Sequence, residues 1–191
     1  MYRAVALAAL RAGIALDNAQ HLEQLALASD IELAAESRVL LNGEDVSAAI
    51  REPEISQAAS RVSASAGVRR ALVAQQRRMG EEHSVVMEGR DIGSVVFPQA
   101  QVKVFLDADP AERAARRAAE LQAKGVAAAA SEVEREMRER DNRDRSRPEA
   151  PLLQAPDAVY LDSSGLTIDQ VEEAVLRIVL DRTSNGKEAE R

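Results

Sequence analysis

Two charged segments of the chain carry residue types that could bind a phosphate group. In the first, Arg90 and Asp91 follow Gly89, soon after the apolar residues 84–87. An arginine donates paired hydrogen bonds to a phosphate, and an aspartate accepts from an amino or hydroxyl group. A site for a phosphorylated ligand is therefore one interpretation of the pair. The alternative is an ion pair that satisfies itself and caps the following loop.

The second segment is the charged run at residues 139–147. On a helix, Arg140, Arg143, Asp144 and Arg147 fall three and four residues apart and share one face. That face has no apolar member, so a solvated helix with its own salt bridges is one interpretation. The other is an arginine face that closes over phosphates as mobile lids do, with Asp144 accepting hydrogen bonds from ribose hydroxyls.

Two further groups give weaker signals. Small polar residues at 57–65, among them Ser60, lie close in sequence to Arg69. A helix face that packs closely against a neighbour has the same composition, so this pattern alone does not indicate a binding site. Tyr2 and Arg3 indicate no chemistry by themselves.

The elements that would position these side chains alternate between strand and helix in the second half of the chain. Short apolar strands alternating with helices predict an α/β fold, a parallel sheet with helices on both faces. Functional residues in such sheets gather beyond the carboxyl ends of the strands. The predicted strands are 84–87, 102–106 and 158–161, with helices at 110–124, 131–146 and 168–180. The strands are followed by Glu88 to Asp91, by Asp107, and by Asp162 to Ser164.

Capping residues are expected at the starts of these helices: Asp109 before the first, and capping boxes formed by Ser131 with Glu134 and by Thr167 with Gln170. The first half of the chain is expected to hold helices at 1–11, 20–28, 54–63 and 68–82, and short strands at 31–36 and 38–41. Asn18 is a candidate cap for the second of these helices.

Composition excludes several kinds of chemistry. The 191 residues include no Cys and two His, which excludes disulfides and zinc–thiolate sites and argues against a Ser–His–Asp triad. The 25 basic and 32 acidic residues give a net charge of −7, which argues against general binding to nucleic acid or membrane surfaces. No apolar run has the length of a membrane span and no signal peptide is visible, so we expect a cytoplasmic location.

Arginine dominates the basic residues, with 22 Arg against 3 Lys. Arginine suits bidentate binding of phosphates, but GC-rich codons give the same excess of Ala and Arg. Each arginine is therefore interpreted from its neighbours.

Together these segments resemble the bacterial cytidylate kinases, a family of nucleoside monophosphate kinases. GRDIGSVVFP followed by FLDA, and RDNRDRSR before a proline-rich connection, are specific signatures. The matching stretches run in the family's order across nearly the whole chain: MYRAVALAAL, LNGEDVSAAIR, ISQAASRVSA, GVRRAL, MEGRDIGSVVFPQAQVKVFLDADPAERAARR, ERDNRDRSRPEAPL and VYLDSS.

The resemblance implies an α/β fold of the P-loop nucleoside monophosphate kinase type, with one domain over residues 1–191. It implies an insert that binds the monophosphate at 31–66 and an arginine-rich lid at 126–150, while the polar residues 185–191 are expected to be disordered. The implied reaction is ATP-dependent phosphorylation of CMP or dCMP with Mg²⁺. The implied partners are therefore these nucleotides, without nucleic acid or membrane, and the implied state is a monomer.

The family's motifs also imply roles for the acceptor-binding residues. Tyr2 and Arg3 match a pair that lies against the acceptor nucleotide and its phosphate. Ser60 and Arg69 match positions that read the pyrimidine.

The charged segments receive the remaining roles. Arg90 and Arg147 match phosphate-binding arginines, Asp91 matches an aspartate that reads the base, and Asp144 matches the acid that binds ribose. The lid arginines, which offset charge on the transferring phosphoryl group, are matched by Arg140 and Arg143. We expect Arg3, Asp91 and Arg147 to converge on one pyrimidine monophosphate.

One departure from the family pattern concerns the donor phosphates. The glycine-rich loop G-x-x-x-x-G-K-[ST] does not occur in the chain, so we expect the family's first strand–helix–strand unit to be missing. The amides and lysine that hold the donor phosphates, and the hydroxyl that binds Mg²⁺, would then be absent. The alternatives are a remnant that binds CMP without transferring phosphate, and an RNA-associated protein, which the scarcity of aromatic residues argues against.

We predict that the 191-residue chain folds poorly and transfers phosphate slowly, because these donor-binding groups are not in it. The measurement is ADP release from ATP plus CMP by the purified chain, with ATP alone as the control. Robust turnover that depends on CMP contradicts the prediction.

Overall fold

The structure is a computed structural model that describes residues 1–126, 129–147 and 150–188. It divides the chain into two compact units, Met1–Val86 and Met87–Arg191, and each is considered by itself. The expected single domain over 1–191 and the expected insert at 31–66 stay predictions.

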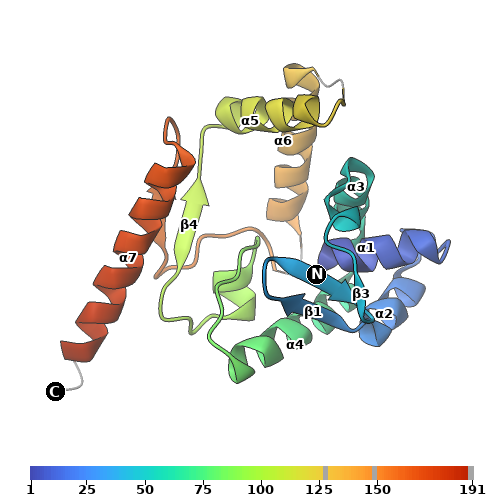
Figure 1. The fold of residues 1–191 in the computed structure, drawn as a ribbon, viewed down its shortest axis with the longest axis horizontal. Helices are drawn as coiled ribbons and strands as arrows, with labels where there is room; N and C mark the ends of the chain where they lie inside the picture. The colour runs from blue at the N-terminus through green and yellow to red at the C-terminus, as the bar shows by residue number, and fades with distance from the viewer. Residues whose placement is uncertain (127–128, 148–149, 189–191) are drawn as a thin grey trace. The chain divides into compact units, whose positions relative to one another are not determined.

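Unit 1 is built mainly on helices (Figure 1), and their apolar faces form one core. Val5, Leu22, Val62 and Leu72 come from different helices and are fully or almost fully buried in that core. The helices are α1 (Tyr2–Arg11), α2 (Ala19–Ala28), α3 (Pro53–Val62) and α4 (Ala66–Glu82), with a 3₁₀ turn, η1, at Ala49–Arg51. The predicted cap of α2 is confirmed, because Asn18 accepts a hydrogen bond from the backbone N–H of His21 at 3.1 Å.

A small antiparallel sheet completes unit 1. Its strands, in order, are β1 (Ile31–Ala34), β2 (Arg38–Leu41) and β3 (Glu44–Asp45). Ile31 pairs with Leu41, and both are buried, so the base of this sheet is fixed to the helical core. The two short strands predicted for this region are confirmed.

Unit 2 contains a parallel pair of strands, so the α/β class is confirmed. β4 (Val104–Asp107) pairs with β5 (Val159–Asp162) in register from Val104 opposite Val159 to Asp107 opposite Asp162. The helices of this unit are α5 (Pro110–Ala123), α6 (Ala130–Ser146) and α7 (Ile168–Glu188). Figure 1 shows α5 and α6 beyond the carboxyl end of β4, where they lie side by side.

Residues 84–87 do not form the predicted strand. They lie in irregular backbone at the boundary between the units, and the Val86 side chain is fully exposed. A strand needs a neighbour for its backbone hydrogen bonds, and among the described residues β4 pairs only with β5. The prediction was wrong because an apolar run looks the same whether or not a partner strand lies beside it.

The predicted caps had mixed outcomes. Thr167 and Gln170 form the expected capping box, with hydrogen bonds of 2.9 and 3.3 Å in the two directions. The box at Ser131 was wrong, because α6 begins at Ala130 without a side-chain cap and Ser131 lies inside its first turn. Alanine has the highest helix propensity, which favours this earlier start.

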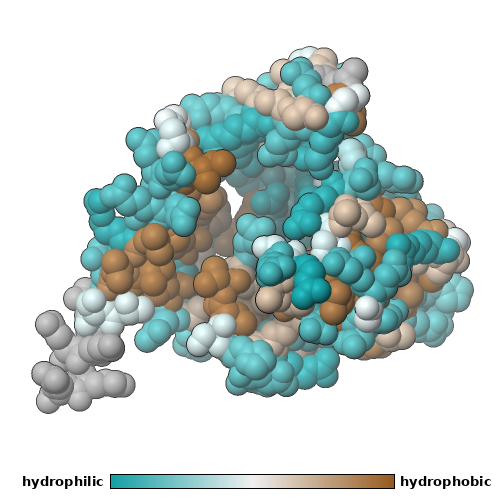
Figure 2. Space-filling view, in the orientation of Figure 1, coloured by the Kyte–Doolittle hydropathy of each residue, from teal (hydrophilic) through white to brown (hydrophobic). Residues whose placement is uncertain are grey.

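α7 extends beyond the predicted residue 180. It is helical to Glu188, so residues 185–188 of the expected disordered tail belong to a helix, while 189–191 lie outside the described residues. Hydrophobic residues gather on the exposed surface over the middle of α7 (Figure 2), and Leu176 and Leu180 are each more than half exposed. The helix predicted at 168–180 therefore ends later than expected.

The turn between β1 and β2 is strained at a serine, which allows a stability test. Glu36 and Ser37 have φ of +59° and +57°, a region that glycine adopts at least cost. We predict that Ser37→Gly raises the free energy of unfolding by about 0.5 kcal/mol, measured by urea denaturation.

Gly43→Ala is the matched control, since Gly43 has φ of +82° and no atom within 4 Å of an added Cβ. It should lower stability by about 1 kcal/mol through backbone strain alone. A loss of stability in Ser37→Gly contradicts the prediction.

Candidate active site

Three of the predicted site residues come together in unit 2. The Nε of Arg90 donates to Oδ2 of Asp144 at 3.2 Å, and Nη1 of Arg147 lies 3.4 Å from Oδ1 of the same carboxylate. Asp144 is 8% exposed, whereas Arg90 is 43% exposed. The carboxylate therefore holds one guanidinium group on each of its oxygens, and Arg90 extends from this cluster to solvent.

The end of α6 folds around the same residue. The backbone carbonyl of Asp144 accepts from the N–H of Leu152 at 2.8 Å and from Nε of Arg147 at 3.3 Å. Asp144 thus fixes Arg147 through both its main chain and its side chain. The three residues are called the Asp144 cluster below: Arg90, Asp144 and Arg147.

A second buried acid of α6 was missed by the sequence analysis. Asp141 lies one turn before Asp144, is 6% exposed, and accepts from Nη2 of Arg113 on α5 at 2.6 Å. The spacing of three residues to Asp144 places both acids on one face, and this signal was available in the sequence. In the described part of α6 the remaining buried residue is Val133, so this helix is held largely by ion pairs.

The other predicted residues of unit 2 lie in different settings. Asp91 is buried, and its carbonyl accepts from the N–H groups of Val95 and Val96, which begins the π-helical turn η2 at Ile92–Val96. Arg143 is exposed and its Nε donates to the carbonyl of Glu139 at 3.4 Å. Arg140 is half-buried. The residues of the predicted common face of α6 therefore differ in exposure: Asp144 is buried against Arg147, Arg140 is half-buried and Arg143 is exposed.

The predicted residues of unit 1 lie on α1, α3 and α4. Arg3 donates from Nη1 to the carbonyl of Ile50 at 3.0 Å and from Nη2 to Oγ of Ser56 at 3.4 Å. Tyr2 and Ser60 are half-buried, and Arg69 is buried at 5% exposure. These residues belong to a different unit from the Asp144 cluster, so the convergence of Arg3, Asp91 and Arg147 stays a prediction.

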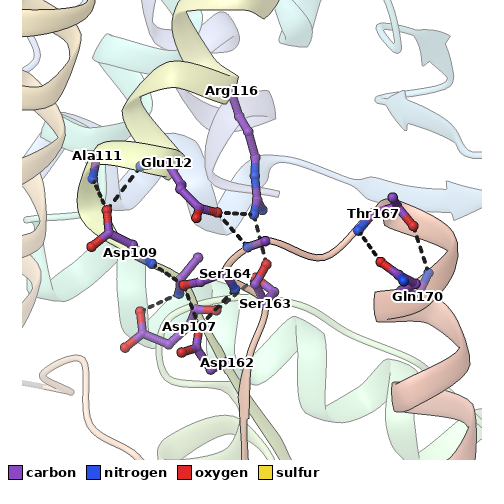
Figure 3. A network of polar contacts seen from close by, with 12 residues as sticks. Asp107, Asp109, Ala111, Glu112, Arg116, Asp162, Ser163, Ser164, Thr167 and Gln170 are labelled. Atoms are coloured by element: carbon purple, nitrogen blue, oxygen red, sulfur yellow. Dashed lines mark hydrogen bonds and ion pairs between the residues drawn. The ribbon is translucent and has the colours of Figure 1, made fainter.

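The carboxyl ends of β4 and β5 form a polar network (Figure 3). The hydroxyl of Ser163 donates to the carbonyl of Asp107 at 2.8 Å, which ties the two strand ends together. The hydroxyl of Ser164 accepts from the N–H of Asp109, which caps α5, at 2.8 Å. Polar residues thus follow both strands at one edge of the sheet, as the sequence predicted.

A second layer of this network links α5 to the loop after β5. Glu112 accepts from the N–H of Gly165 at 2.8 Å, and Arg116 donates to the carbonyl of Ser163 at 2.9 Å. Glu112 and Arg116 also form an ion pair at 3.3 Å. Contacts from α5 thus help to fix this loop, in addition to the hydrogen bonds within it.

Two kinds of structure are not found among the described residues. In 1–126, 129–147 and 150–188 no three His, Asp or Glu side chains are grouped so that they could hold a metal ion. Within the same ranges no helix combines the length and apolar character needed to cross a bilayer.

Comparison with known proteins decides the family. The family model for cytidylate kinase matches residues 1–181. The chain belongs to the cytidylate kinase family. It is 56% identical to a cytidylate kinase of Solibacter usitatus over 190 residues, which cover 98% of this chain and 82% of that protein. It is 51% identical to a cytidylate kinase of Syntrophotalea carbinolica over 187 residues, covering 95% and 79%, and 49% identical to one of a Geobacter species over 189 residues, covering 97% and 81%.

The expectation that the family's first unit is missing is not borne out. The family model matches from residue 1 onward. All the stretches that resemble the family, from Tyr2-Arg3 onward, lie within this matched range. The cytidylate kinase match therefore does not depend on a glycine-rich loop. The expected slow phosphate transfer is not tested by these comparisons.

The network at the strand ends yields a pH-dependent prediction. The hydroxyl and backbone N–H of Ser164 donate to Asp162 and hold the pKa of that carboxyl below its ordinary value of 3.8. A lowered pKa stabilises the folded state above the pKa of the unfolded chain, and this contribution is lost as the pH falls through the folded pKa. We expect Ser164→Ala to raise the pKa of Asp162. The part of the variant's stability deficit, relative to the unaltered chain, that comes from this carboxylate should be present at neutral pH and disappear under acidic conditions.

The measurement is a carboxyl carbon NMR titration combined with unfolding at several pH values. Ser47→Ala is the matched control, because Ser47 donates to Asp45 in the same way within unit 1 and holds the pKa of that carboxyl below 3.8. That variant should move the pKa of Asp45 and leave Asp162 unchanged. An unchanged pKa of Asp162 in Ser164→Ala contradicts the prediction.

Proposed function

We propose that this cytidylate kinase family member phosphorylates CMP and dCMP to the diphosphates with ATP as the phosphate donor. The observation that carries the proposal is the Asp144 cluster, in which a buried carboxylate gathers two arginines from separate segments. Paired guanidinium groups beside a carboxylate suit a nucleotide, which offers a phosphate and ribose hydroxyls together.

The cluster binds the phosphate and ribose of the acceptor nucleotide in this proposal. Arg90 and Arg147 donate to the phosphate, and Asp144 accepts from a ribose hydroxyl. Tyr2 and Arg3, which match the family's pair at the start of the chain, are assigned to the acceptor nucleotide and its phosphate in the same proposal.

Recognition of the base rests on Asp91, Ser60 and Arg69. Cytosine presents an amino donor at N4, and a carboxylate with an arginine satisfies its polar edge. Uracil presents a carbonyl oxygen at the same position, so the acid would face another acceptor. A buried polar group left in that state costs about 1–3 kcal/mol.

The chemical step needs in-line positioning and positive charge around the transferring phosphoryl oxygens. Arg140 and Arg143 supply that charge from α6. ATP and Mg²⁺ are the family's donor and cofactor, and when bound the metal neutralises phosphate charge. The described residues form no group of acids or histidines that could hold this metal, and the chain has no G-x-x-x-x-G-K-[ST] sequence.

The experiment compares CMP with UMP by calorimetry and by nucleotide-dependent ADP release. We expect CMP to bind about 10- to 100-fold more tightly than UMP, which corresponds to about 1–3 kcal/mol. Asp91→Asn should reduce this ratio severalfold, because an amide can donate to the uracil oxygen after rotation.

Asp157→Asn is the control, since Asp157 pairs with Lys103 and is 59% exposed. It should leave the CMP to UMP ratio unchanged. Equal affinity for CMP and UMP in the unaltered chain contradicts the proposal. Tight CMP binding without CMP-dependent ADP release would instead support the alternative that the chain binds CMP but does not transfer phosphate to it.

A further inference from the structure

We infer that Asp144 is a positioning residue that sets Arg90 and Arg147 for one phosphate, in addition to any contact it makes with ribose. The inference rests on the proposed function and assigns a second task to the same carboxylate. A ribose ligand alone would need only an accessible acceptor, whereas Asp144 is 8% exposed and lies between two guanidinium groups.

The way Arg90 is held shows which of its donors remain for a ligand. Its bond to Asp144 uses Nε, and among the described residues its Nη groups have no hydrogen-bond partner. Its side chain is 43% exposed. Fixing an arginine through Nε leaves the outer nitrogens pointing away from the carboxylate, which is the edge that a phosphate binds in bidentate fashion.

Arg147 is held more tightly than Arg90. Its side chain is 12% exposed, its Nη1 lies 3.4 Å from the Asp144 carboxylate, and its Nε donates to the Asp144 carbonyl. Two guanidinium groups this close repel each other, and the carboxylate between them offsets that repulsion. Without the Asp144 carboxylate, more of the ordering of Arg90 would have to come from the ligand, at a cost in affinity.

Positioning and simple electrostatics predict opposite effects on phosphate binding when the charge of Asp144 is removed. An acid next to a phosphate site repels the phosphate, so Asp144→Asn should strengthen phosphate binding if charge alone matters. It should weaken binding if the acid orders the arginines. Ribose contact can be separated from both effects with a nucleotide that lacks ribose hydroxyls.

The probe is therefore 2′,3′-dideoxycytidine 5′-monophosphate, titrated into the full chain by calorimetry. We expect Asp144→Asn to weaken its binding by about 5- to 20-fold, in line with the loss of ordered charge-assisted hydrogen bonds. Unchanged binding means that Asp144 acts through ribose hydroxyls alone, and tighter binding means that it acts as a charge. Either result overturns the inference.

A double-mutant cycle tests the coupling directly. Arg90→Ala should weaken binding of the dideoxynucleotide by about 20-fold in the unaltered chain and by less than about 3-fold in Asp144→Asn, because Arg90 is no longer ordered there. Equal losses in both backgrounds overturn the inference. Asp157→Asn, whose acid pairs with Lys103 outside the cluster, should leave both affinities unchanged.

Nitrogen relaxation of the arginine Nε groups tests positioning without any nucleotide. The Nε of Arg90 should be ordered in the unaltered chain and become as mobile in Asp144→Asn as that of Arg138, which is 69% exposed. Equal mobility in both chains overturns the inference. Failure of the unaltered chain to bind CMP would overturn the proposed function, and a loss of Arg90 order in Asp144→Asn would then still show that Asp144 positions it.

Discussion

The buried face of α6 carries two carboxylates, Asp141 and Asp144, besides the apolar Val133. Asp141 and Asp144 lie one turn apart and each receives an arginine from another segment, from α5 and from the chain before η2. Buried ion pairs contribute little net stability, because desolvation offsets much of their attraction, but removal of one partner is costly. Such pairs specify where the helix lies, and at Asp144 the same contact also determines where two cations are placed.

The parallel pairing of β4 and β5 sets the second part of unit 2. Parallel strands end at the same edge, so Asp107 and Asp162 lie opposite each other and the residues after them share a network. Ser163 and Ser164 connect the strand ends, and Glu112 and Arg116 of α5 fix the loop that follows. The polar residues after a sheet of two strands can therefore be fixed when a neighbouring helix, here α5, supplies the hydrogen bonds.

The resemblance to cytidylate kinases was readable from short motifs, and the family match over residues 1–181 confirmed it. The missing-unit interpretation was not borne out, because it was drawn from one absent motif while the family signature is spread along the matched range. The pair of Asp141 and Arg113 was not predicted, because the face of the helix at 131–146 was defined by the positions of its arginines. A face defined by the acids, which are three residues apart, would have included Asp141.

Local chemistry fixed what the sequence could determine by itself: the helices and their caps at Asn18, Asp109 and Thr167, the short strands of the first half, and the polar residues after β4 and β5. These features depend on neighbours within a few residues, which a sequence displays directly. Tertiary structure alone decided that residues 84–87 pair with no strand in the described part of the chain, and that Asp144 meets Arg90, which lies 54 residues away. Both outcomes depend on which distant segments lie alongside, and neither hydrophobic pattern nor charge spacing encodes that for a single element.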